Sequence, residues 1–364
     1  MTPRATLRRR AFRSTLAVAM VTLALAGIAE SKQPPVTAVA ISPDGEWAVA
    51  ASQHGLRAYS WRTFSRQPTP EHDAAQSAAI QVDFPDIHAL AFSPDGRWLA
   101  VAGGVASEAG IVELVAWPGG AERQRGQLHR DMIASVAWQS SESLATGSLD
   151  HDIRLWSVES NDTSKENPAS LQPSSKLSGH SRGVTSLCFV NDQTLVSAGI
   201  DQNLRVWNVQ SGELVRSLNN HTAAVQQVAA RPGHRASPGS PAMEARRGQA
   251  RLPWLASASD DGTVRLWQPT IGRMVRFVRL DSAPLAVAWS LPIANHAQAP
   301  APAQLFVVDR AGTLLSIDPD TAAVQKLRTV IDGWCYCLAA HPTNGSLLVG
   351  GENGQLQRVA PASP

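Results

Sequence analysis

The fold is decided by SGHSRGVTSLCF (178–189) and the stretch that follows it, LVSAGIDQNLRVWNV (195–209). Here a histidine stands four residues before an apolar run, a serine four residues before an aspartate, and a tryptophan six residues after that aspartate. The spacing recurs in NNHTAAVQQVAA (219–230) with LASASDDGTVRLW (255–267), and once more from His129 onwards. Alternating apolar and polar residues over such short runs predict β-strands. The sequence therefore indicates an array of similar antiparallel sheets.

The recurring residues can form a hydrogen-bonded chain in each unit. An indole N–H only donates, a hydroxyl donates and accepts, and a neutral imidazole does both, so the four groups are mutually compatible. A buried aspartate is costly unless it is paired, and the histidine can pair with it. We expect these residues to be structural; they are His129, Thr146, Asp150 and Trp156, then His180, Ser197, Asp201 and Trp207, then His221, Ser257, Asp261 and Trp267.

At these residues the sequence resembles the WD40 repeat family. The resemblance implies that each set of four forms a ladder from tryptophan through serine or threonine and histidine to aspartate. It also implies a β-propeller, in which the rim around a narrow central channel is a common place for gripping partners. We call each set of four the tetrad. The resemblance extends from about residue 36 to 359 but is uneven, because four of the units lack the tetrad.

The number of units follows from the starts of the first apolar strand in each. These starts are Val36, Ile87, Ile133, Val184, Val225, Pro284 and Cys335. One sheet cannot cover both of its faces, whereas seven sheets around an axis cover one another and hide their edges. We predict an all-β, seven-bladed propeller of four-stranded antiparallel blades over residues 36–359. The seventh blade is expected to have three strands, or a fourth strand that pairs poorly. Only residues 30–35 could supply that fourth strand, and their two prolines cannot donate backbone hydrogen bonds.

Blades one, two, six and seven lack the tetrad. The position of the aspartate holds His54, Ala109, Ala311 and Asn353, and that of the tryptophan holds Ser60, Val115, Ile317 and Val359. We expect apolar packing to hold these four blades together instead of a hydrogen-bonded ladder.

The N-terminus reads as an export signal. Five arginines lie between Arg4 and Arg13, and the apolar run 16–29 follows, with Gly27 and Ala29 at the −3 and −1 positions of a cleavage site. The run is too short to span a bilayer comfortably. We expect residues 1–29 to be a signal peptide, with an uncleaved anchor as the alternative. Because residues 9–12 resemble a twin-arginine signal, we expect an exported, bacterial-type family member that is periplasmic or extracellular.

Charge and cysteine content exclude several classes of protein. The chain has 32 Lys and Arg against 30 Asp and Glu, but the five N-terminal arginines account for the whole excess. The remainder offers no basic surface for a nucleic acid. Three cysteines exclude a disulfide-dense scaffold. Strand alternation places Cys335 and Cys337 on one face, too far apart for a disulfide unless a bulge intervenes, and Cys188 reads as a small core residue.

The remaining chemistry motifs are not found. The sequence lacks the spacings typical of zinc and haem sites, nucleophile elbows, phosphate-binding loops and dinucleotide folds. We therefore expect no catalytic residue, no metal and no cofactor. Paired carboxylates in the central channel stay open, because a sequence does not show which side chains converge there.

Loop lengths distinguish the two ends of the blades. The long insertions 62–77, 158–174, 232–252 and 291–303 all fall on one face, where they either dock a partner or are surface drift. The arginines of 232–252 either bind acidic groups or lipid headgroups, or are simply solvated. The opposite face has short loops and suits recognition at low ordering cost. Its candidate partner-binding residues are His54, Leu149, Arg182, Ile200, Asp260 and Trp334.

These observations favour an exported, monomeric propeller that binds a protein or peptide and has no catalysis of its own. The alternative is a propeller enzyme, a lactonase, hydrolase or quinoprotein-like dehydrogenase, with its site in the central channel. Three or more Asp, Glu, His or Asn side chains directed at one point of the channel would favour the enzyme. A third hypothesis is a structural partner of a membrane complex, retained by an uncleaved N-terminus.

Overall fold

The computed structural model describes residues 33–64, 77–120, 123–159, 170–232, 255–290 and 303–360. The chain divides into two units, Met1–Gln33 and Pro34–Pro364, and every described strand belongs to the second. The predicted signal peptide lies outside the described residues, so its cleavage stays a prediction. Among the described residues, no helix combines the length and the apolar character needed to cross a membrane.

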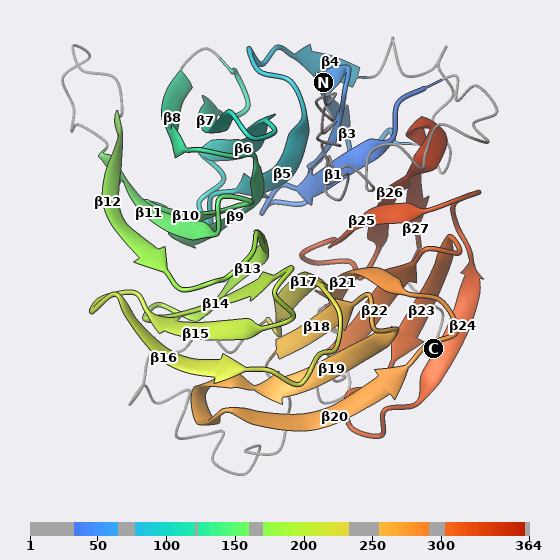
Figure 1. The fold of residues 1–364 in the computed structure, drawn as a ribbon. Helices are drawn as coiled ribbons and strands as arrows, with labels where there is room; N and C mark the ends of the chain where they lie inside the picture. Colours follow the sequence, from blue (N-terminus) through green and yellow to red (C-terminus); the bar gives the residue numbers. More distant parts are fainter. Residues whose placement is uncertain are drawn as a thin grey trace, which may run out of the picture. The chain divides into compact units, whose positions relative to one another are not determined.

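The second unit consists of antiparallel sheets, each built from strands that follow one another in the chain (Figure 1). Blades one to three contain β1 (Val36–Ile41), β2 (Trp47–Ser52), β3 (Gly55–Ser60) and β4 (Ser77–Ile80); β5 (Ile87–Phe92), β6 (Trp98–Val105), β7 (Ala109–Ala116) and β8 (Arg123–His129); β9 (Ile133–Ser140), β10 (Ser143–Ser148), β11 (Asp152–Glu159) and β12 (Ser170–Ser178). Blades four and five contain β13 (Val184–Asn191), β14 (Thr194–Gly199), β15 (Leu204–Asn208) and β16 (Glu213–Leu218); β17 (Val225–Ala230), β18 (Leu255–Ser259), β19 (Thr263–Gln268) and β20 (Arg273–Arg279), with the short 3-10 helix η3 (Pro269–Ile271) before β20.

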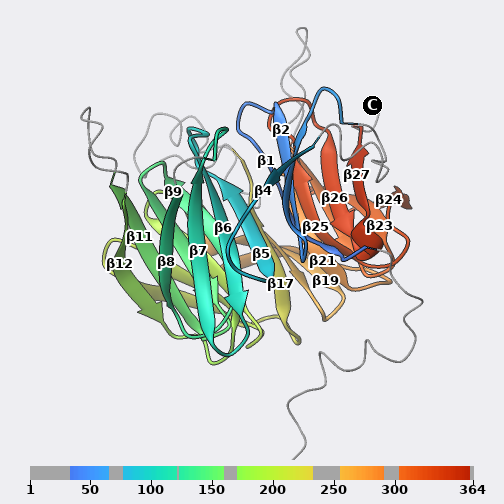
Figure 2. The same cartoon turned by 90° about the horizontal axis from the view of Figure 1, so that it is seen from above.

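Blades six and seven complete the ring. They contain β21 (Pro284–Ser290), β22 (Gln304–Asp309), β23 (Thr313–Ile317) and β24 (Val324–Thr329); β25 (Cys335–Ala340), β26 (Leu347–Gly351), the 3-10 helix η4 (Glu352–Gly354) and β27 (Leu356–Val359). Each innermost strand contacts the innermost strand of the next blade, and β25 contacts β1 (Figures 1 and 2). The prediction of an all-β, seven-bladed propeller is confirmed.

All seven innermost strands begin at the residues that the repeat predicted. Each also contains a β-bulge at its second residue, an irregularity that the sequence pattern did not indicate. A bulge leaves one residue out of the ladder and re-aims its side chain. The re-aimed residues line the central channel; they are Thr37, His88, Ala134, Thr185, Gln226, Leu285 and Tyr336.

The third residue of several innermost strands ties its blade to the next one. The Leu187 N–H donates to Ser135 Oγ at 2.9 Å, and the Val228 N–H donates to Ser186 Oγ at 3.1 Å. The Val287 N–H donates to Gln227 Oε1 at 2.7 Å. Each innermost strand is the edge of its own sheet, so alternate backbone N–H groups point away from that sheet. These hydrogen bonds therefore join blades three to six in sequence.

Apolar packing fills the spaces between blades, and two tryptophans at the ends of innermost strands contribute to it. The indoles of Trp138 and Trp289 are buried, and their N–H groups donate across the blade boundary to the carbonyls of Ala91 and Ala229, each at 3.0 Å. Blade two departs from the expectation of apolar packing alone, since buried Glu113 pairs with Arg123 at 2.8 Å. A buried carboxylate needs such a partner.

The seventh sheet has three strands within the described residues, in the order β25–β26–β27. The chain that leaves β3 packs against this blade. Trp61 is buried with its ring centroid 4.7 Å from that of His341 and 4.4 Å from the guanidinium carbon of Arg358. Arg358 also donates to the Trp61 carbonyl at 2.8 Å, and His341 Nε2 lies 3.0 Å from the Gly45 carbonyl oxygen. We call Trp61, His341 and Arg358 the closure cluster, because it joins blade seven to blade one.

Candidate partner-binding face

Tetrad residues meet in blades three, four and five. In blade four, Trp207 Nε1–H donates to Ser197 Oγ at 2.8 Å, and His180 lies 2.7 Å from that oxygen and 2.9 Å from the Asp201 carboxylate. The distances in blades three and five fall between 2.8 and 2.9 Å, through Trp156, Thr146, His129 and Asp150, and through Trp267, Ser257, His221 and Asp261. All three histidine side chains are fully buried, so none is placed to act on a substrate as a base.

Each tetrad aspartate also organises the loop that enters its blade. Asp150 accepts the Arg130 N–H at 2.9 Å, and Asp201 accepts the Ser181 N–H at 3.0 Å. Burial raises the pKa of Asp201, but the hydrogen bond and charge of the His180 ring, the Ser181 N–H and Arg205 together lower it to about 2. The pKa of Asp150 is likewise about 2, because His129 outweighs burial. The tetrads thus hold charged carboxylates beneath the surface formed by these loops.

The entry loops and the second-to-third-strand turns meet on one face, which we call the loop rim. In four blades the backbone N–H of a turn residue donates to the carbonyl of an entry loop, at 2.9 to 3.0 Å: Leu149 to Met132, Ile200 to Gly183, Asp260 to Ala224 and Arg310 to Ala283. In blades three to six the entry loop is thereby fixed to a turn of its own blade. Such short, doubly anchored loops bind with little loss of conformational entropy.

The structure places all six predicted partner-binding residues on the loop rim, in two groups. His54, Arg182 and Trp334 are exposed, whereas Leu149, Ile200 and Asp260 are half-buried. Leu149 and Ile200 lie close to Gly183, where an added Cβ would contact both side chains. His54 is separate from these, in a second hollow of about 230 Å³ between blades one and two that Ser52, Phe84 and Asp86 also line.

Asp260 and Trp334 are linked by a residue that the sequence analysis did not select. Arg310 pairs with Asp260 at 2.7 Å, and its guanidinium carbon lies 4.9 Å from the centre of the Trp334 ring. Trp334 keeps 42% of its surface exposed, so its ring is accessible to a partner. The three side chains form a row across blades five, six and seven. Arg310 precedes Ala311 as Asp260 precedes Asp261, so the spacing of the repeat could have located it.

The row continues towards the channel. Gln226 donates to Asp260 at 2.7 Å, and Tyr336 lies against Trp334 with ring centroids 6.1 Å apart. The Tyr336 hydroxyl lies 3.4 Å from Glu352, and burial together with that carboxylate raises the pKa of Tyr336 to about 12. Because Gln226 and Tyr336 also line the channel, the row connects the loop rim with the mouth of the channel.

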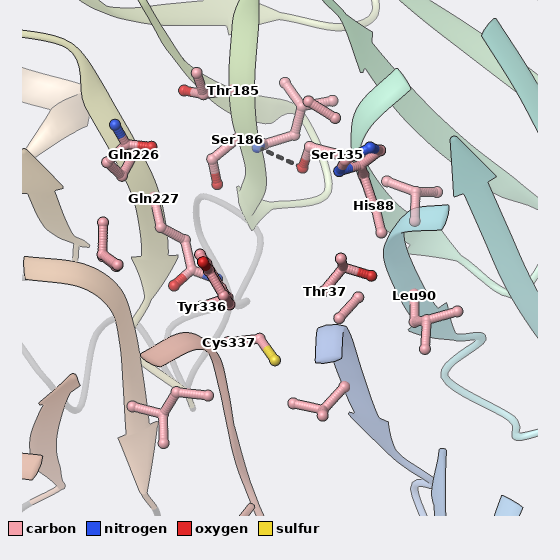
Figure 3. A pocket seen from close by; sticks show the side chains of 18 of the residues that line it. Thr37, His88, Leu90, Ser135, Thr185, Ser186, Gln226, Gln227, Tyr336 and Cys337 are labelled. Atoms are coloured by element: carbon pink, nitrogen blue, oxygen red, sulfur yellow. Dashed lines mark hydrogen bonds between the residues drawn. The ribbon is translucent and has the colours of Figure 1, made fainter. Parts of the chain in front are cut away.

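The central channel is a cavity of about 280 Å³ lined by all seven innermost strands. Figure 3 shows Thr37, Ser135, Thr185, Gln227 and Tyr336 among its polar side chains. Its lining includes His88, whose pKa is lowered by burial despite nearby Asp86, but no carboxylate. In the described part of the chain, no group of three His, Cys, Asp or Glu residues could hold a metal ion. The lining is thus that of a neutral, hydrogen-bonding channel.

The cysteines correct one detail of the sequence analysis. The expectation that Cys335 and Cys337 share a face is wrong, because the bulge at Tyr336 lies between them. Cys335 packs towards blade six and Cys337 towards blade one. Burial raises the pKa of both thiols, that of Cys335 to about 12, so neither is a reactive thiolate at neutral pH. None of the three cysteines forms a disulfide, and Cys188 is half-buried.

The long insertions join the strands that the sequence analysis assigned to them. Two connect third to fourth strands, β3 to β4 and β11 to β12, and two connect first to second strands, β17 to β18 and β21 to β22. All four therefore begin and end on the face opposite the loop rim. Most of their residues, including the arginines of 232–252, lie outside the described residues.

Comparison with known proteins identifies the repeat. The family model "WD domain, G-beta repeat" matches residues 28–59, 82–107, 124–157, 171–208 and 212–268, more than half of the chain. It covers most of the first five blades. The sixth and seventh blades, which lack the tetrad, lie outside the matched residues.

Curated relatives match at 25 to 30% identity. The chain is similar to the guanine nucleotide-binding protein subunit beta of Zea mays, 27% identical over 65% of this chain and 56% of the relative. It is similar to telomerase protein component 1 of Rattus norvegicus, 25% identical over 89% of this chain and 11% of the relative. Mitochondrial division protein 1 of Schizosaccharomyces pombe is 26% identical over 43% of this chain and 26% of its own length. The chain thus spans between about a tenth and just over half of the length of these three relatives. These relatives are eukaryotic and do not support a bacterial-type exported member.

Proposed function

The chain belongs to the WD40 repeat family, and we propose that it is an exported platform that binds a protein or peptide on the loop rim and has no catalysis of its own. The observation that carries the proposal is the row of Asp260, Arg310 and Trp334 across three blades. An exposed tryptophan braced by an arginine is typical of the residues that dominate binding energy at protein interfaces.

The chemistry of the channel supports a binding role over an enzymatic one. Propeller enzymes need several acidic or histidine side chains at one point, and among the described residues the channel lining contributes one histidine and no carboxylate. Several relatives are also named as parts of assemblies, namely a guanine nucleotide-binding protein subunit, a telomerase component and a THO complex subunit. A similar role for this chain is the simplest extension of the likeness.

Replacing the Trp334 ring tests the binding face. A partner captured by the full chain is identified by mass spectrometry, purified and titrated against the variants by calorimetry. We expect Trp334→Ala to weaken its binding about tenfold or more, since truncation of a central aromatic residue typically costs about 2 kcal/mol. Leu128→Ala is the matched control, because Leu128 is equally exposed on outer strand β8. Equal affinity of wild type and Trp334→Ala would refute the loop rim as the docking surface.

Export is tested separately at the N-terminus. We expect the chain isolated from its native compartment to begin at Glu30, because Gly27 and Ala29 satisfy a signal peptidase site. N-terminal sequencing or intact-mass analysis measures this directly. A chain that begins at Met1 and fractionates with the membrane would instead support retention by an uncleaved anchor, and one that begins at Met1 inside the cell would contradict export.

A further inference from the structure

The outer strands of blades four, five and six carry a concentration of positive charge. These strands, β16, β20 and β24, occupy the periphery of three consecutive blades (Figure 1). Their charged residues are Arg216, Arg273, Arg276, Arg279, Lys326 and Arg328 against the single acid Glu213, with Asp318 and Asp320 in the turn before β24. After residue 29, by contrast, acidic residues outnumber basic ones by 30 to 27. These three strands therefore carry a net positive charge, although the chain after residue 29 is net negative.

Contacts between the blades make this a continuous surface. Arg216 donates from Nε to the carbonyl of Thr270 in η3 at 3.2 Å, which joins blade four to blade five. Arg276 helps to lower the pKa of Asp318, after the backbone N–H of Asp320 and the contacts of Thr321, so blades five and six are also near neighbours here. We call the six cations with Val215, Ile271 and Phe277 the outer strip.

The apolar members of the outer strip are unusually exposed. Ile271 is 60% exposed, Phe277 54% and Val215 52%. If the strands carried only cations, protection against edge-to-edge aggregation would explain them. Large exposed apolar side chains between them have the opposite effect and raise that risk. Protection against aggregation therefore does not account for the combination.

Cations and apolar side chains together match the interface of an anionic bilayer. Arginine and lysine are attracted to lipid phosphates and anionic headgroups, while aromatic and aliphatic side chains enter the boundary between headgroups and acyl chains. The outer strip lies on the convex periphery of the ring, with cations on all three blades and two of its three apolar residues, Ile271 and Phe277, on the central blade. A flat, deformable surface can meet such a convex strip, whereas a rigid protein partner would need a concave counterpart.

We propose that the outer strip binds anionic phospholipid surfaces. Contact through the periphery holds the channel axis along the plane of the bilayer. The loop rim then stays accessible, so lipid binding and partner binding occupy different surfaces. This proposal does not depend on the proposed function, and either can fail alone.

A local probe tests the proposal in the full chain, independently of any contact made by the N-terminus. Cys188 is first changed to alanine, since Cys335 and Cys337 are buried, and an environment-sensitive fluorophore is then attached at Ile271→Cys or, as a control on the loop rim, at Gln53→Cys. With vesicles of phosphatidylcholine and phosphatidylglycerol we expect a blue shift at position 271 and none at position 53. Vesicles of phosphatidylcholine alone should produce neither shift.

A matched pair of charge variants provides the second arm. The triple change Arg216→Gln, Arg276→Gln and Lys326→Gln should raise about tenfold the lipid concentration needed for the shift at position 271. The triple change Arg57→Gln, Arg130→Gln and Arg182→Gln removes the same charge from exposed residues elsewhere and should leave that concentration within about twofold. No shift at 271, equal weakening by both triples, or a shift with polyglutamate but not with anionic vesicles would each overturn the proposal.

Discussion

Trp61→Ala is expected to lower the free energy of unfolding by about 3–5 kcal/mol, the usual cost of truncating a buried tryptophan. The indole is 4% exposed and packs between blade one and blade seven, against Phe64, His341 and Arg358. Its loss leaves a cavity and removes the surface on which the Arg358 guanidinium stacks. Chemical denaturation of the full chain measures the change.

Because Trp61 lies between the first and last blades, we also expect its loss to affect these two blades more than the others. Blade seven has three strands within the described residues, so the closure cluster makes up part of the contact that joins it to blade one. We expect hydrogen exchange in Trp61→Ala to accelerate most in β25–β27 and β1–β3. Trp289→Ala is the matched control, because that buried indole lies between blades five and six. If both variants accelerated exchange equally in all blades, the closure cluster would have no special part in closing the ring.

The strand starts could be predicted because they are local. Val225 and Pro284, for example, begin short runs of mostly apolar residues that can be recognised without knowing the rest of the fold. The closure cluster was not predictable in this way. Trp61 and His341 are 280 residues apart, and no short-range pattern connects them. A contact between the first and last blades depends on the circumference of the finished ring.

On the loop rim too, the residues could be predicted from local spacing, whereas the contacts between blades could not. Leu149, Ile200 and Asp260 each stand one residue before a tetrad aspartate, which is how they were located. Arg310 occupies the same position of the repeat in blade six, which has no tetrad. The pairing of Arg310 with Asp260 across two blades required coordinates. The bulge at Tyr336 was likewise hidden, since a run such as CYCLAA reads as regular alternation. Buried Glu113 was missed because, in sequence, a carboxylate on a strand reads as solvent-exposed.

Asp201→Ala is expected to lower the free energy of unfolding by about 1–3 kcal/mol at neutral pH. The substitution removes the acceptor of three donors: the buried His180 ring, the Ser181 N–H and the half-buried Arg205 guanidinium. Asp320→Ala, in an exposed turn, is the control and should change stability by less than about 0.5 kcal/mol. Urea denaturation at pH 7 compares the two. Equal stabilities of Asp201→Ala and wild type would show that the tetrad adds nothing to the propeller.

The same variant should also change how stability depends on pH. The pKa of Asp201 is about 2 in the folded chain and 3.8 without the fold, so its stabilising effect is complete above the higher value and disappears as the pH falls to the lower one. The difference between these two pKa values corresponds to about 2 kcal/mol of folding free energy. The difference in stability between wild type and Asp201→Ala should therefore shrink by about that amount between pH 5 and pH 2. A difference that stayed constant over this range would show that the charge of the Asp201 carboxylate adds nothing to the stability of the folded chain.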